Sequence, residues 1–415
     1  MVIYPKDWDM TELGTKCEVT SSKRVFESEW KNAGIPFLRT RDIASFHAGT
    51  EQKDKLFISE STYYEKVKAS GEPCIGDLLV TGVGTIGLPY LVNRVPMYFK
   101  DGNILWVKRS ESFEPQFLYL LFLSNEIKQQ IIDGSGFTTV GTFTIKNAKK
   151  LRLPCPEKNE QKVIADTLSC IDTHIANLTE LIEKKKAIRD AALEDILSGG
   201  TRLVGFSGEW EEYSFDDFFT LLPNNTLSRE KLSERGTIGN IHYGDVLIKY
   251  HNNVTDKDEI PRIKADIDTR SFRLLQSGDI IIADTAEDET VGKAIQICDV
   301  SMPLVGGLHT IVCRPNYDTA LGYLGYYINS KNYHNQLFPH ITGIKVSSIS
   351  KKAIKTTVLN LPKDIDEQKA IVEVLTSLDA EIASFEEEKD KMLQIKAGAM
   401  DDLLTGRVRL VRQGG

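Results

Sequence analysis

The sequence predicts an α+β protein made of two similar halves, in which two α+β globular domains are joined by two long antiparallel coiled-coil helices. Three observations predict this fold class. A long helical segment occurs twice, a fainter repeat precedes each copy, and the last residues repeat the segment that leads into the second domain. The repeat is therefore cyclic, and we expect a pseudo-twofold arrangement. At 415 residues the chain is also too long for one ordinary hydrophobic core.

The two globular domains are expected to alternate with the two helical segments along the chain. In chain order the boundaries are 1–155 for the first domain, 156–200 for the central helical spacer, 201–363 for the second domain and 364–415 for the C-terminal helical spacer. Both domains contain a Gly-Asp pair followed by apolar residues, at 76–80 and 278–282, which predicts a turn leading into a buried strand. A tryptophan, Trp8 or Trp210, lies 69 residues before each of these aspartates. Short helical patterns such as 117–130 occur beside these strands, so we predict that each domain is α+β.

The helical repeat is the strongest signal in the chain. Residues 160–203 and 367–410 align without a gap at an offset of 207, and 17 of their 44 positions are identical. Apolar residues recur at alternating spacings of three and four, which predicts a coiled-coil seam. The seam residues are Leu168, Ile171, Ile175, Leu178 and Ile182 in the first copy and Leu375, Leu378, Ile382 and Phe385 in the second. Because so narrow a seam cannot bury one helix alone, we expect the two copies to pair antiparallel.

Each helix has a clear predicted end. No Pro or Gly interrupts residues 160–197, so at about 1.5 Å per residue this helix could approach about 57 Å. Gly199 and Gly406 then lie where a helix C-cap favours a residue that tolerates positive φ.

The composition excludes several classes of protein. An apolar share of 41% and a charged share of 27% are typical of a folded globular chain. No apolar run approaches the roughly 18 residues of a membrane helix, and residues 1–16 lack the pattern of a secretory signal, so we expect a cytoplasmic protein without a membrane partner. The six cysteines are scattered without zinc spacing, which favours reduced thiols and no metal site.

The distribution of charge indicates where a polyanion could bind. The net charge is -8, and the two helical segments carry most of it, -3 over 156–200 and -5 over 364–415. Each globular domain ends in a stretch without any acidic residue, 134–156 in the first and 319–363 in the second. Lysines and small hydroxyl residues of this kind suit DNA phosphates, whereas the alternative is a basic surface loop without a ligand. The candidates are Thr138, Thr139, Lys146, Lys149, Lys150 and Arg152, and Lys345, Ser347, Ser348, Lys351, Lys352 and Lys355.

Base-reading residues should differ between the two domains if the two half-sites differ. The candidates are therefore Arg39, Arg41, His242, Asn252 and Asn253. Arg39 aligns with His242, and Arg41 aligns with a glycine. Arginine suits bidentate contact with guanine, and asparagine suits adenine. Each also has a plain alternative as an exposed polar loop residue.

One motif favours an enzyme instead. Residues 82–87 satisfy the pattern GxGxxG directly after a predicted strand. The following residues, 88–92, predict another strand rather than the helix that would hold a pyrophosphate, and the equivalent stretch 284–292 keeps only the last glycine. The sequence also lacks a phosphate-binding GxxxxGK[ST] loop and an Asn-Pro-Pro-Tyr-like motif for a flipped adenine. We therefore expect no catalytic residues and no cofactor in this chain. A nucleotide- or S-adenosylmethionine-dependent enzyme built on this loop stays as the alternative.

The motifs around the two helices resemble those of a known family. Leu361-Pro362 is followed by Glu367-Gln368-Lys369 and by a helix that ends in Leu-Thr-Gly at 404–406. The same pattern occurs at 153–154, 160–162 and 197–199. Together with the lead-in at 205–210, these motifs are similar to those of the specificity subunit of type I restriction-modification enzymes.

The resemblance implies a function that composition and spacing do not show. Each globular domain would be a target-recognition domain that reads one half of a bipartite double-stranded DNA sequence, and the helices would set the gap between the halves. The helices would also dock modification subunits, which bind S-adenosylmethionine and methylate adenine, while a restriction subunit cleaves DNA with ATP and Mg. A further alternative is a repeat protein whose helices serve protein partners only.

Overall fold

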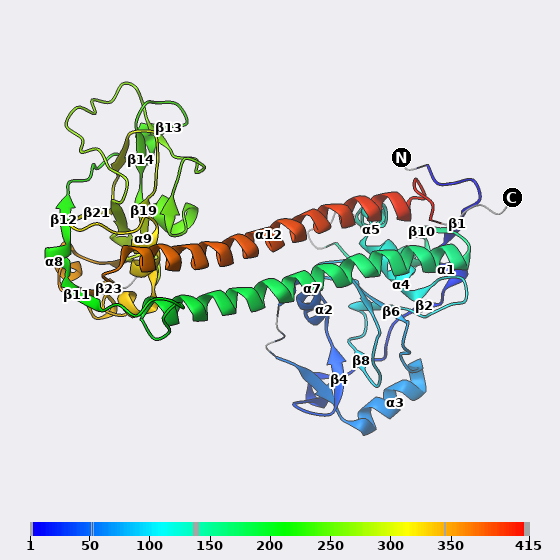
Figure 1. The fold of residues 1–415 in the computed structure, drawn as a ribbon. Coiled ribbons are helices and arrows are strands. Elements are labelled where there is room, and N and C mark those ends of the chain that lie inside the picture. The colour runs from blue at the N-terminus through cyan, green and yellow to red at the C-terminus, as the bar shows by residue number, and fades with distance from the viewer. Residues whose placement is uncertain (1–2, 51, 53, 136–140, 344–345, 411–415) are drawn as a thin grey trace. The chain divides into compact units, whose positions relative to one another are not determined.

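The computed structural model describes residues 3–50, 52, 54–135, 141–343 and 346–410. It divides into two compact units, residues 1–179 with 387–415 and residues 180–386. Each unit combines one globular domain with the first half of one long helix and the second half of the other (Figure 1). The boundaries expected from the sequence follow the chain, whereas the compact units cut across both helices.

The globular domain of unit 1 contains two four-stranded sheets and a two-stranded pair. The first sheet has the order β2-β9-β6-β7, with β2 at Val19–Thr20, β9 at Ile104–Val107, β6 at Leu78–Thr81 and β7 at Pro89–Leu91. The second has the order β3-β5-β4-β8, with β3 at Trp30–Lys31, β5 at Leu56–Ile58, β4 at Ile35–Leu38 and β8 at Tyr98–Phe99. β1 (Asp9–Glu12) pairs antiparallel with β10 (Arg152–Cys155) next to the start of the long helix.

The globular domain of unit 2 repeats these strand orders, with β15 as an added strand in its first sheet. Its first sheet has the order β12-β21-β17-β19-β15, at Phe219–Leu222, Thr310–Pro315, Ile280–Ala283, Ala294–Ile297 and Asn253–Val254. Its second has the order β13-β16-β14-β20, at Leu232–Ser233, Arg262–Ile263, Gly239–Ile241 and Leu304–Gly306. β11 (Trp210–Ser214) pairs with β23 (Val358–Pro362) as β1 pairs with β10, and β18 (Thr285–Ala286) pairs with β22 (Ser347–Ser348).

Short helices cover the sheets of both domains. In unit 1 they are α1 (Leu13–Lys16), α2 (Thr40–Ala48), α3 (Glu60–Ser70), α4 (Pro115–Leu123), α5 (Asn125–Gly134) and α6 (Ile145–Lys149), with the 3-10 turn η1 at Glu27–Glu29. In unit 2 they are α8 (Phe215–Phe218), α9 (Tyr323–Asn329), α10 (Lys331–His334) and α11 (Lys351–Ile354), with the turns η2 (Arg229–Lys231), η3 (Asp245–Lys249) and η4 (Phe338–His340). The single helical pattern expected over 117–130 is two helices, because Ser124 ends α4 and caps α5 through its hydroxyl.

Buried aspartates explain why both domains fold the same way. The carboxylate of Asp77 accepts hydrogen bonds from the backbone N–H of Cys74 and the indole N–H of Trp106. Asp279 accepts the corresponding backbone bond from Gln276 and is held by the guanidinium of Arg314. Each aspartate therefore fixes the turn that starts the central strand, β6 or β17, as the sequence repeat predicts.

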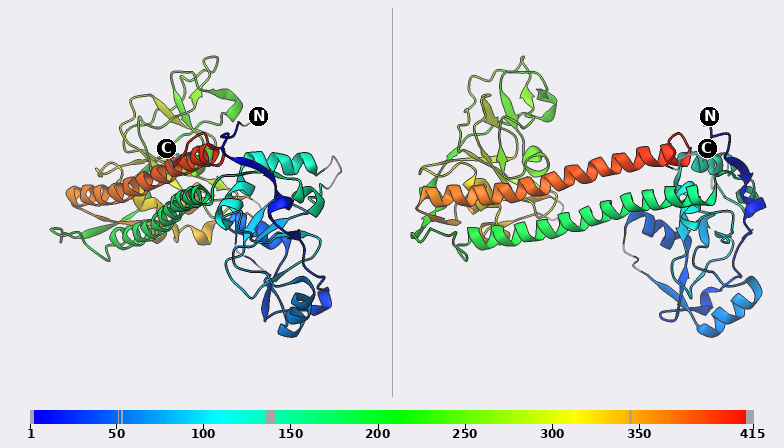
Figure 2. Two further views of the ribbon diagram at one scale, coloured as in Figure 1. Left: turned by 90° about the vertical axis from the view of Figure 1, so that its right-hand side faces the viewer. Right: turned by 45° about the vertical axis from the view of Figure 1, so that its right-hand side comes forward.

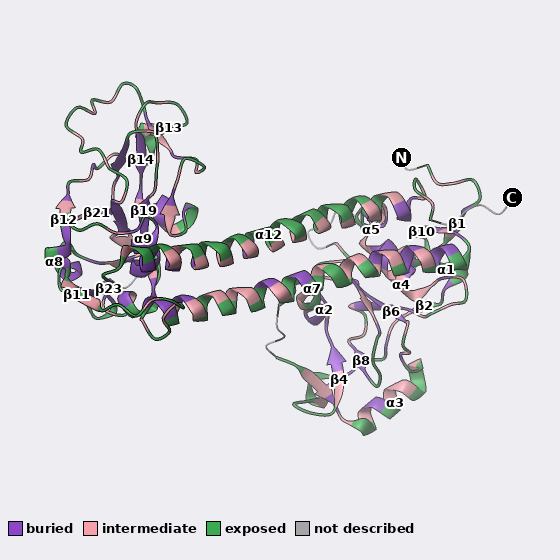
Figure 3. Cartoon of the chain, in the orientation of Figure 1, coloured by how far each residue is buried: buried purple, intermediate pink, exposed green. Residues whose placement is uncertain are grey.

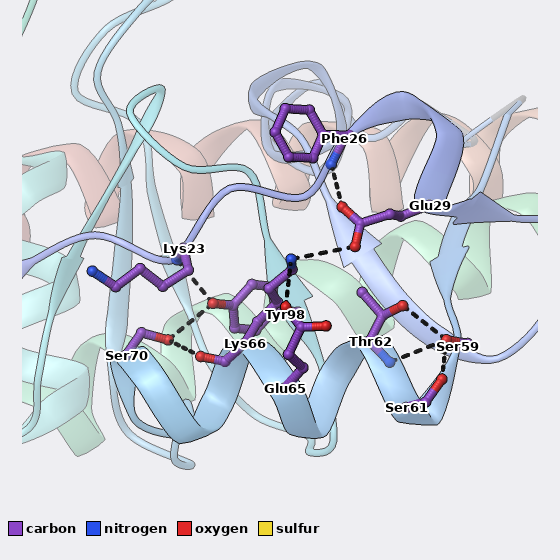
Figure 4. A network of polar contacts seen from close by, with 10 residues as sticks. All are labelled: Lys23, Phe26, Glu29, Ser59, Ser61, Thr62, Glu65, Lys66, Ser70 and Tyr98. Carbon is purple, nitrogen blue, oxygen red and sulfur yellow. Dashed lines mark hydrogen bonds and ion pairs between the residues drawn. The ribbon is translucent and has the colours of Figure 1, made fainter.

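Helix α3 distinguishes the two domains, because no helix occupies the corresponding place between β16 and β17 in the described part of unit 2. A polar network holds this helix (Figure 4): the Ser59 hydroxyl caps it by accepting from the Thr62 backbone N–H, and the ammonium of Lys66 contacts Glu29 at 3.3 Å. The Ser70 hydroxyl hydrogen-bonds to Tyr98, which ties the last turn to β8. This helix is a feature that the internal repeat does not predict.

The two long helices are α7 (Lys158–Leu197) and α12 (Ile365–Leu404), each 40 residues long. Each is followed by the expected glycine, with φ of 75° at Gly199 and 71° at Gly406. All nine seam residues are buried or half-buried, and exposed residues occupy the outer faces of both helices (Figure 3).

Ion pairs within each unit show that the helices run antiparallel. In unit 1, Asp172 pairs with Lys396 and His174 contacts Glu388. In unit 2, Lys185 pairs with Glu381 and Arg189 pairs with Asp379. Rising numbers on α7 meet falling numbers on α12 in both units, which confirms the predicted pairing direction.

The helix ends complete the core of each domain. In unit 1, Ile164 and Leu168 at the start of α7 pack with Leu403 and Leu404 at the end of α12 in the core of the first domain. In unit 2 the start of α12 and the end of α7 enter the core of the second domain in the same way, through Ile371, Leu375, Leu193, Ile196 and Leu197. Burial of these side chains stabilises each domain by roughly 1.5–3 kcal/mol per residue, so the helices belong to the domain cores.

Candidate nucleic-acid interface

The basic segment of unit 1 centres on α6. The Thr144 hydroxyl caps this helix by accepting from the Asn147 backbone N–H, and buried Ala148 faces the core. Lys146, Lys149 and Lys150 are exposed on the helix and its C-cap. One short helix therefore presents several ammonium groups, which suits contact with successive phosphates.

The basic segment of unit 2 centres on α11, which is built in the same way. The Ser350 hydroxyl accepts from the Ala353 backbone N–H, and Lys351, Lys352 and Lys355 are exposed. Lys355 differs from its counterpart in unit 1 because it forms a 2.8 Å ion pair with Asp216. The two candidate surfaces are therefore alike in position and unequal in charge.

In each unit, one glutamine side chain holds the basic segment at an equivalent place. The side chain of Gln130 makes two hydrogen bonds with the backbone of Arg152, at 2.9 and 3.0 Å. Gln336 makes the same two bonds with the backbone of Val358, at 2.9 and 3.1 Å. Arg152 itself lies exposed at the start of β10. The equivalence expected from the sequence is thus present in the structure.

Of the two arginine candidates for base reading, Arg41 is exposed and Arg39 is buried. Arg39 is 8% exposed, and its guanidinium donates to both oxygens of Asp42 at 2.9 Å and to the carbonyl of Asp54. Three of its guanidinium N–H groups therefore hold contacts within the domain, and its predicted base-reading role stays a prediction. Arg41 lies on the outer face of α2, where its guanidinium has a 3.6 Å contact to exposed Asp54 among the described residues. Its guanidinium is accessible to a ligand.

The candidates in unit 2 also have scaffold positions. His242 is 5% exposed, and its backbone N–H donates to Asp245, as that of Arg39 does to Asp42. Asn252 accepts from the side chain of Asn329 at 2.9 Å, and the buried Oδ1 of Asn253 has no hydrogen-bond partner among the described residues. His242 is buried and both asparagines are half-buried, and the predicted base-reading role of all three stays a prediction.

The remaining candidates lie on a hairpin or outside the described residues. Ser347 and Ser348 form β22, and the backbone of Ser348 hydrogen-bonds both ways to Thr342, at 2.8 and 3.0 Å. Both serines are half-buried. Thr138, Thr139 and Lys345 lie outside the described residues, so their predicted role stays a prediction.

The Glu-Gln motif that begins each long helix attaches that helix to its domain. Gln161 accepts from the Glu114 backbone N–H at 2.8 Å and donates to the carbonyl of Pro156 at 2.9 Å. Gln368 accepts from Ala320 and donates to Pro362 at 2.9 Å in both cases. Both glutamines are buried. The same glutamine occurs in both copies of the sequence repeat, which could have indicated that it attaches the helix to its domain. In the sequence this identity served only to align the helices.

The glutamate before each of these glutamines is paired with an arginine that follows the other long helix. Arg202 donates to both oxygens of Glu367 at 2.6 Å and lies over the ring of Trp210. Arg409 forms the same bidentate contact with Glu160 in unit 1, and the Trp8 indole N–H also donates to that carboxylate at 3.1 Å. The segment after α12 therefore lies against the segment around Trp8 (Figure 2).

The glycine-rich loop has the structure of a β-turn. The backbone N–H of Gly82 donates to the carbonyl of Asn103, and the loop connects β6 to β7. A strand therefore follows the loop, as expected. Among the described residues there is also no group of three or more His, Cys, Asp or Glu that could hold a metal. The helices that the structure describes are too short or too polar to cross a bilayer.

Two similar α+β domains on one pair of long helices, each with a basic segment at the same place, define a class of two-domain helical scaffold. The family model of the type I restriction modification DNA specificity domain matches residues 5–187 and 207–394. The chain therefore belongs to the family of type I restriction-modification DNA specificity subunits. Because members of this family are non-catalytic, the alternative enzyme built on residues 82–87 is not supported.

Relatives and solved structures agree over nearly the whole chain. A Methanocaldococcus jannaschii chain inferred to be the MjaX type I restriction enzyme specificity subunit is 24% identical over 98% of this chain and 95% of its own. The MjaVIII specificity subunit of the same organism is 22% identical over 98% and 94%. The specificity subunit structure from M. genitalium has a TM-score of 0.54 at 15% identity, covering 95% and 96% of the two chains. A chain from a structural study of complex assembly in a type I system has a TM-score of 0.59 at 16% identity, covering 98% and 100%. These likenesses support the fold.

Proposed function

We propose that the two globular domains of this DNA specificity subunit each read one half of a bipartite double-stranded DNA target, and that α7 and α12 set the gap. Two equivalent basic segments, at α6 and α11, carry this proposal. A glutamine side chain holds each of them through an equivalent backbone contact, Gln130 in unit 1 and Gln336 in unit 2. Surface lysines of this kind position a protein on DNA phosphates. Side chains such as exposed Arg41 are left to discriminate bases.

The long helices would also dock the partner subunits. Ile188 on α7 and Ile395 on α12 occupy equivalent positions 207 residues apart and are 56% and 53% exposed. Exposed apolar side chains at matching places suit two copies of one protein partner. We assign these partners as modification subunits that bind S-adenosylmethionine, joined by a restriction subunit that uses ATP and Mg. This chain would hold no cofactor and would act in the cytoplasm.

The test is sequencing of methylated DNA from cells that express this subunit with its modification partner. We expect one methylated motif made of two short sequences separated by a fixed gap. Exchange of residues 201–363 for those of another family member should change one half of the motif and leave the other half unchanged. Change of both halves, or of neither, would show that the reading domains are assigned wrongly. Clear micromolar binding of S-adenosylmethionine to the isolated chain would contradict the proposal that the modification subunits, and not this chain, bind the cofactor.

A further inference from the structure

Unit 2 contains a polar network that joins its globular domain to both long helices. The Tyr326 hydroxyl on α9 donates to Oδ2 of Asp379 on α12 at 2.7 Å. Arg189 on α7 contacts Oδ1 of the same carboxylate at 3.3 Å. Burial of Tyr326, together with the negative charge of Asp379, raises the tyrosine pKa, so the hydroxyl stays a donor at neutral pH. Three elements that are far apart in the sequence thus meet at one carboxylate.

Unit 1 has the same residue types at positions 207 residues earlier or later. Asp172 on α7 corresponds to Asp379, and Lys396 on α12, which contacts it at 2.5 Å, corresponds to Arg189. Tyr119 on α4 corresponds to Tyr326 and lies with Asp172 along one groove. Burial, and secondarily the charge of Asp172, raises the pKa of Tyr119. The ion pair is therefore repeated with the roles of the two helices exchanged, whereas Tyr119 lines the groove beside Asp172 without a hydrogen bond to it.

Each ion pair lies beside open space between the domain and its helices. In unit 2 a cleft of about 1110 Å³ is lined by Arg189 and Asp379 from the helices and by Asn252 and His334 from the domain. The groove beside Tyr119 in unit 1 has about 440 Å³. The core packing of Ile371 and Leu375 lies nearer the start of α12, and beside these open spaces the polar network adds a further connection between the domain and the helices.

The network lies further along α12 than the other attachments of the domain described above. Gln368 attaches the start of α12, Ile371 and Leu375 pack in the domain core, and Asp379 lies 11 residues beyond Gln368, about 16 Å at the α-helical rise. A contact this far from the start of the helix resists rocking of the domain about the core packing. In a domain of this size, rocking by about 10° at a radius of about 20 Å displaces the surface by about 3.4 Å, the rise of one base pair.

We propose that the network Tyr326–Asp379–Arg189 is a positioning device that fixes the second reading domain on the helices and so restricts the complex to one gap length. This inference rests on the proposed function. The residues act through the domain that they hold and touch no DNA themselves. Loss of the network should therefore relax the gap requirement more than it weakens binding to the native target.

The experiment compares binding of the subunit, assembled with its modification partners, to DNA duplexes with the native gap and with gaps one base pair shorter or longer. We expect Tyr326→Phe to keep its affinity for the native gap within about threefold, while its preference for that gap falls about tenfold, as loss of one hydrogen bond to a charged group would allow.

Tyr333→Phe is the matched control. This buried hydroxyl hydrogen-bonds to Thr357 at 2.8 Å, so both partners lie within the domain. Its loss should lower thermal stability and leave the gap preference unchanged. A wild-type gap preference in Tyr326→Phe, or an equal loss of preference in Tyr333→Phe, would overturn the proposal. A wild-type complex that tolerates all three gaps would overturn the bipartite function as well as this inference.

Discussion

Arg409 and Glu160 are 249 residues apart in the chain and form a bidentate ion pair in unit 1. Glu160 is only 4% exposed, and its other donor is the indole of Trp8. Arg202 and Glu367 form the corresponding pair in unit 2. Each long helix therefore begins with a buried carboxylate that depends on the residues after the other helix, which gives the cyclic sequence repeat a physical basis.

Arg409→Leu is expected to destabilise unit 1 strongly. The substitution leaves the Glu160 carboxylate buried with the Trp8 indole as its remaining donor, and loss of one partner of a buried ion pair costs about 3 kcal/mol. The free energy of unfolding, measured by urea titration at pH 7.5, should fall by about this amount.

Arg407→Leu provides the control for that experiment. Arg407 lies two residues earlier and pairs with Asp401 and Asp402, and all three side chains are about half exposed. Exposed pairs contribute about 0–1 kcal/mol, so this variant should remain close to wild type. Equal destabilisation by both variants would mean that the tail contributes through general charge and that the buried pair has no special role.

Replacement of Lys146, Lys149 and Lys150 by glutamine is expected to lower the affinity for DNA. It should also make that affinity less dependent on salt concentration. If each lysine neutralises one phosphate, the slope of log K against log salt should become shallower by about 2–3. DNA binding of the assembled complex should be measured between roughly 50 and 200 mM salt, where affinity that comes from phosphate contacts falls steeply. The same replacement of Lys23, Lys31 and Lys68, exposed lysines outside the acid-free segment, should leave the slope unchanged. Equal slopes for both variants would contradict the assignment of α6.

Gly87→Ala is expected to lower stability without any change in nucleotide binding. Gly87 has φ of 81°, and an added Cβ would lie 3.0 Å from Cδ1 of Ile131, so the cost should be about 2 kcal/mol. Gly84→Ala, with φ of 73° and no atom within 4 Å of the added Cβ, should cost about 1 kcal/mol. Wild-type binding of a dinucleotide, lost in both variants, would restore the enzyme alternative.

Long-range order was predictable from the sequence where a pattern repeats. The fixed spacing of Asp77 and Asp279 behind a tryptophan predicted two equivalent turns, and both aspartates cap those turns. The three-four spacing of apolar residues predicted α7 and α12, and their ends fall at the expected Gly199 and Gly406. These features are local or periodic, so one sequence carries enough information to place them.

The site residues were harder to predict because exposure depends on tertiary contacts. Arg39 reads as an exposed cation in the sequence, but Asp42, three residues later, folds back onto its guanidinium. Tyr326 and Asp379 meet only because α9 packs on α12. The offset of 207 that links them to Tyr119 and Asp172 was a usable signal, but it shows equivalence without showing contact.

Stability should depend on pH through His242. Burial, and secondarily the charge of Arg229, lowers the pKa of this imidazole, while Asp245 opposes the shift. Its buried Nδ1 has no hydrogen-bond partner among the described residues. The folded protein therefore favours the neutral ring, and the unfolded chain takes up a proton more readily. The stabilisation is present above the unfolded pKa of about 6.5 and is lost as pH falls through the lower folded pKa.

Thermal unfolding at pH 7.5 and at pH 5.5 tests this dependence. The wild-type midpoint should fall on acidification, and His242→Gln should show a smaller fall because its side chain does not titrate. His251→Gln, which replaces an exposed histidine, should keep the wild-type difference between the two pH values. If His242→Gln and wild type lose the same amount, the acid sensitivity comes from other groups, and the buried imidazole contributes nothing to it.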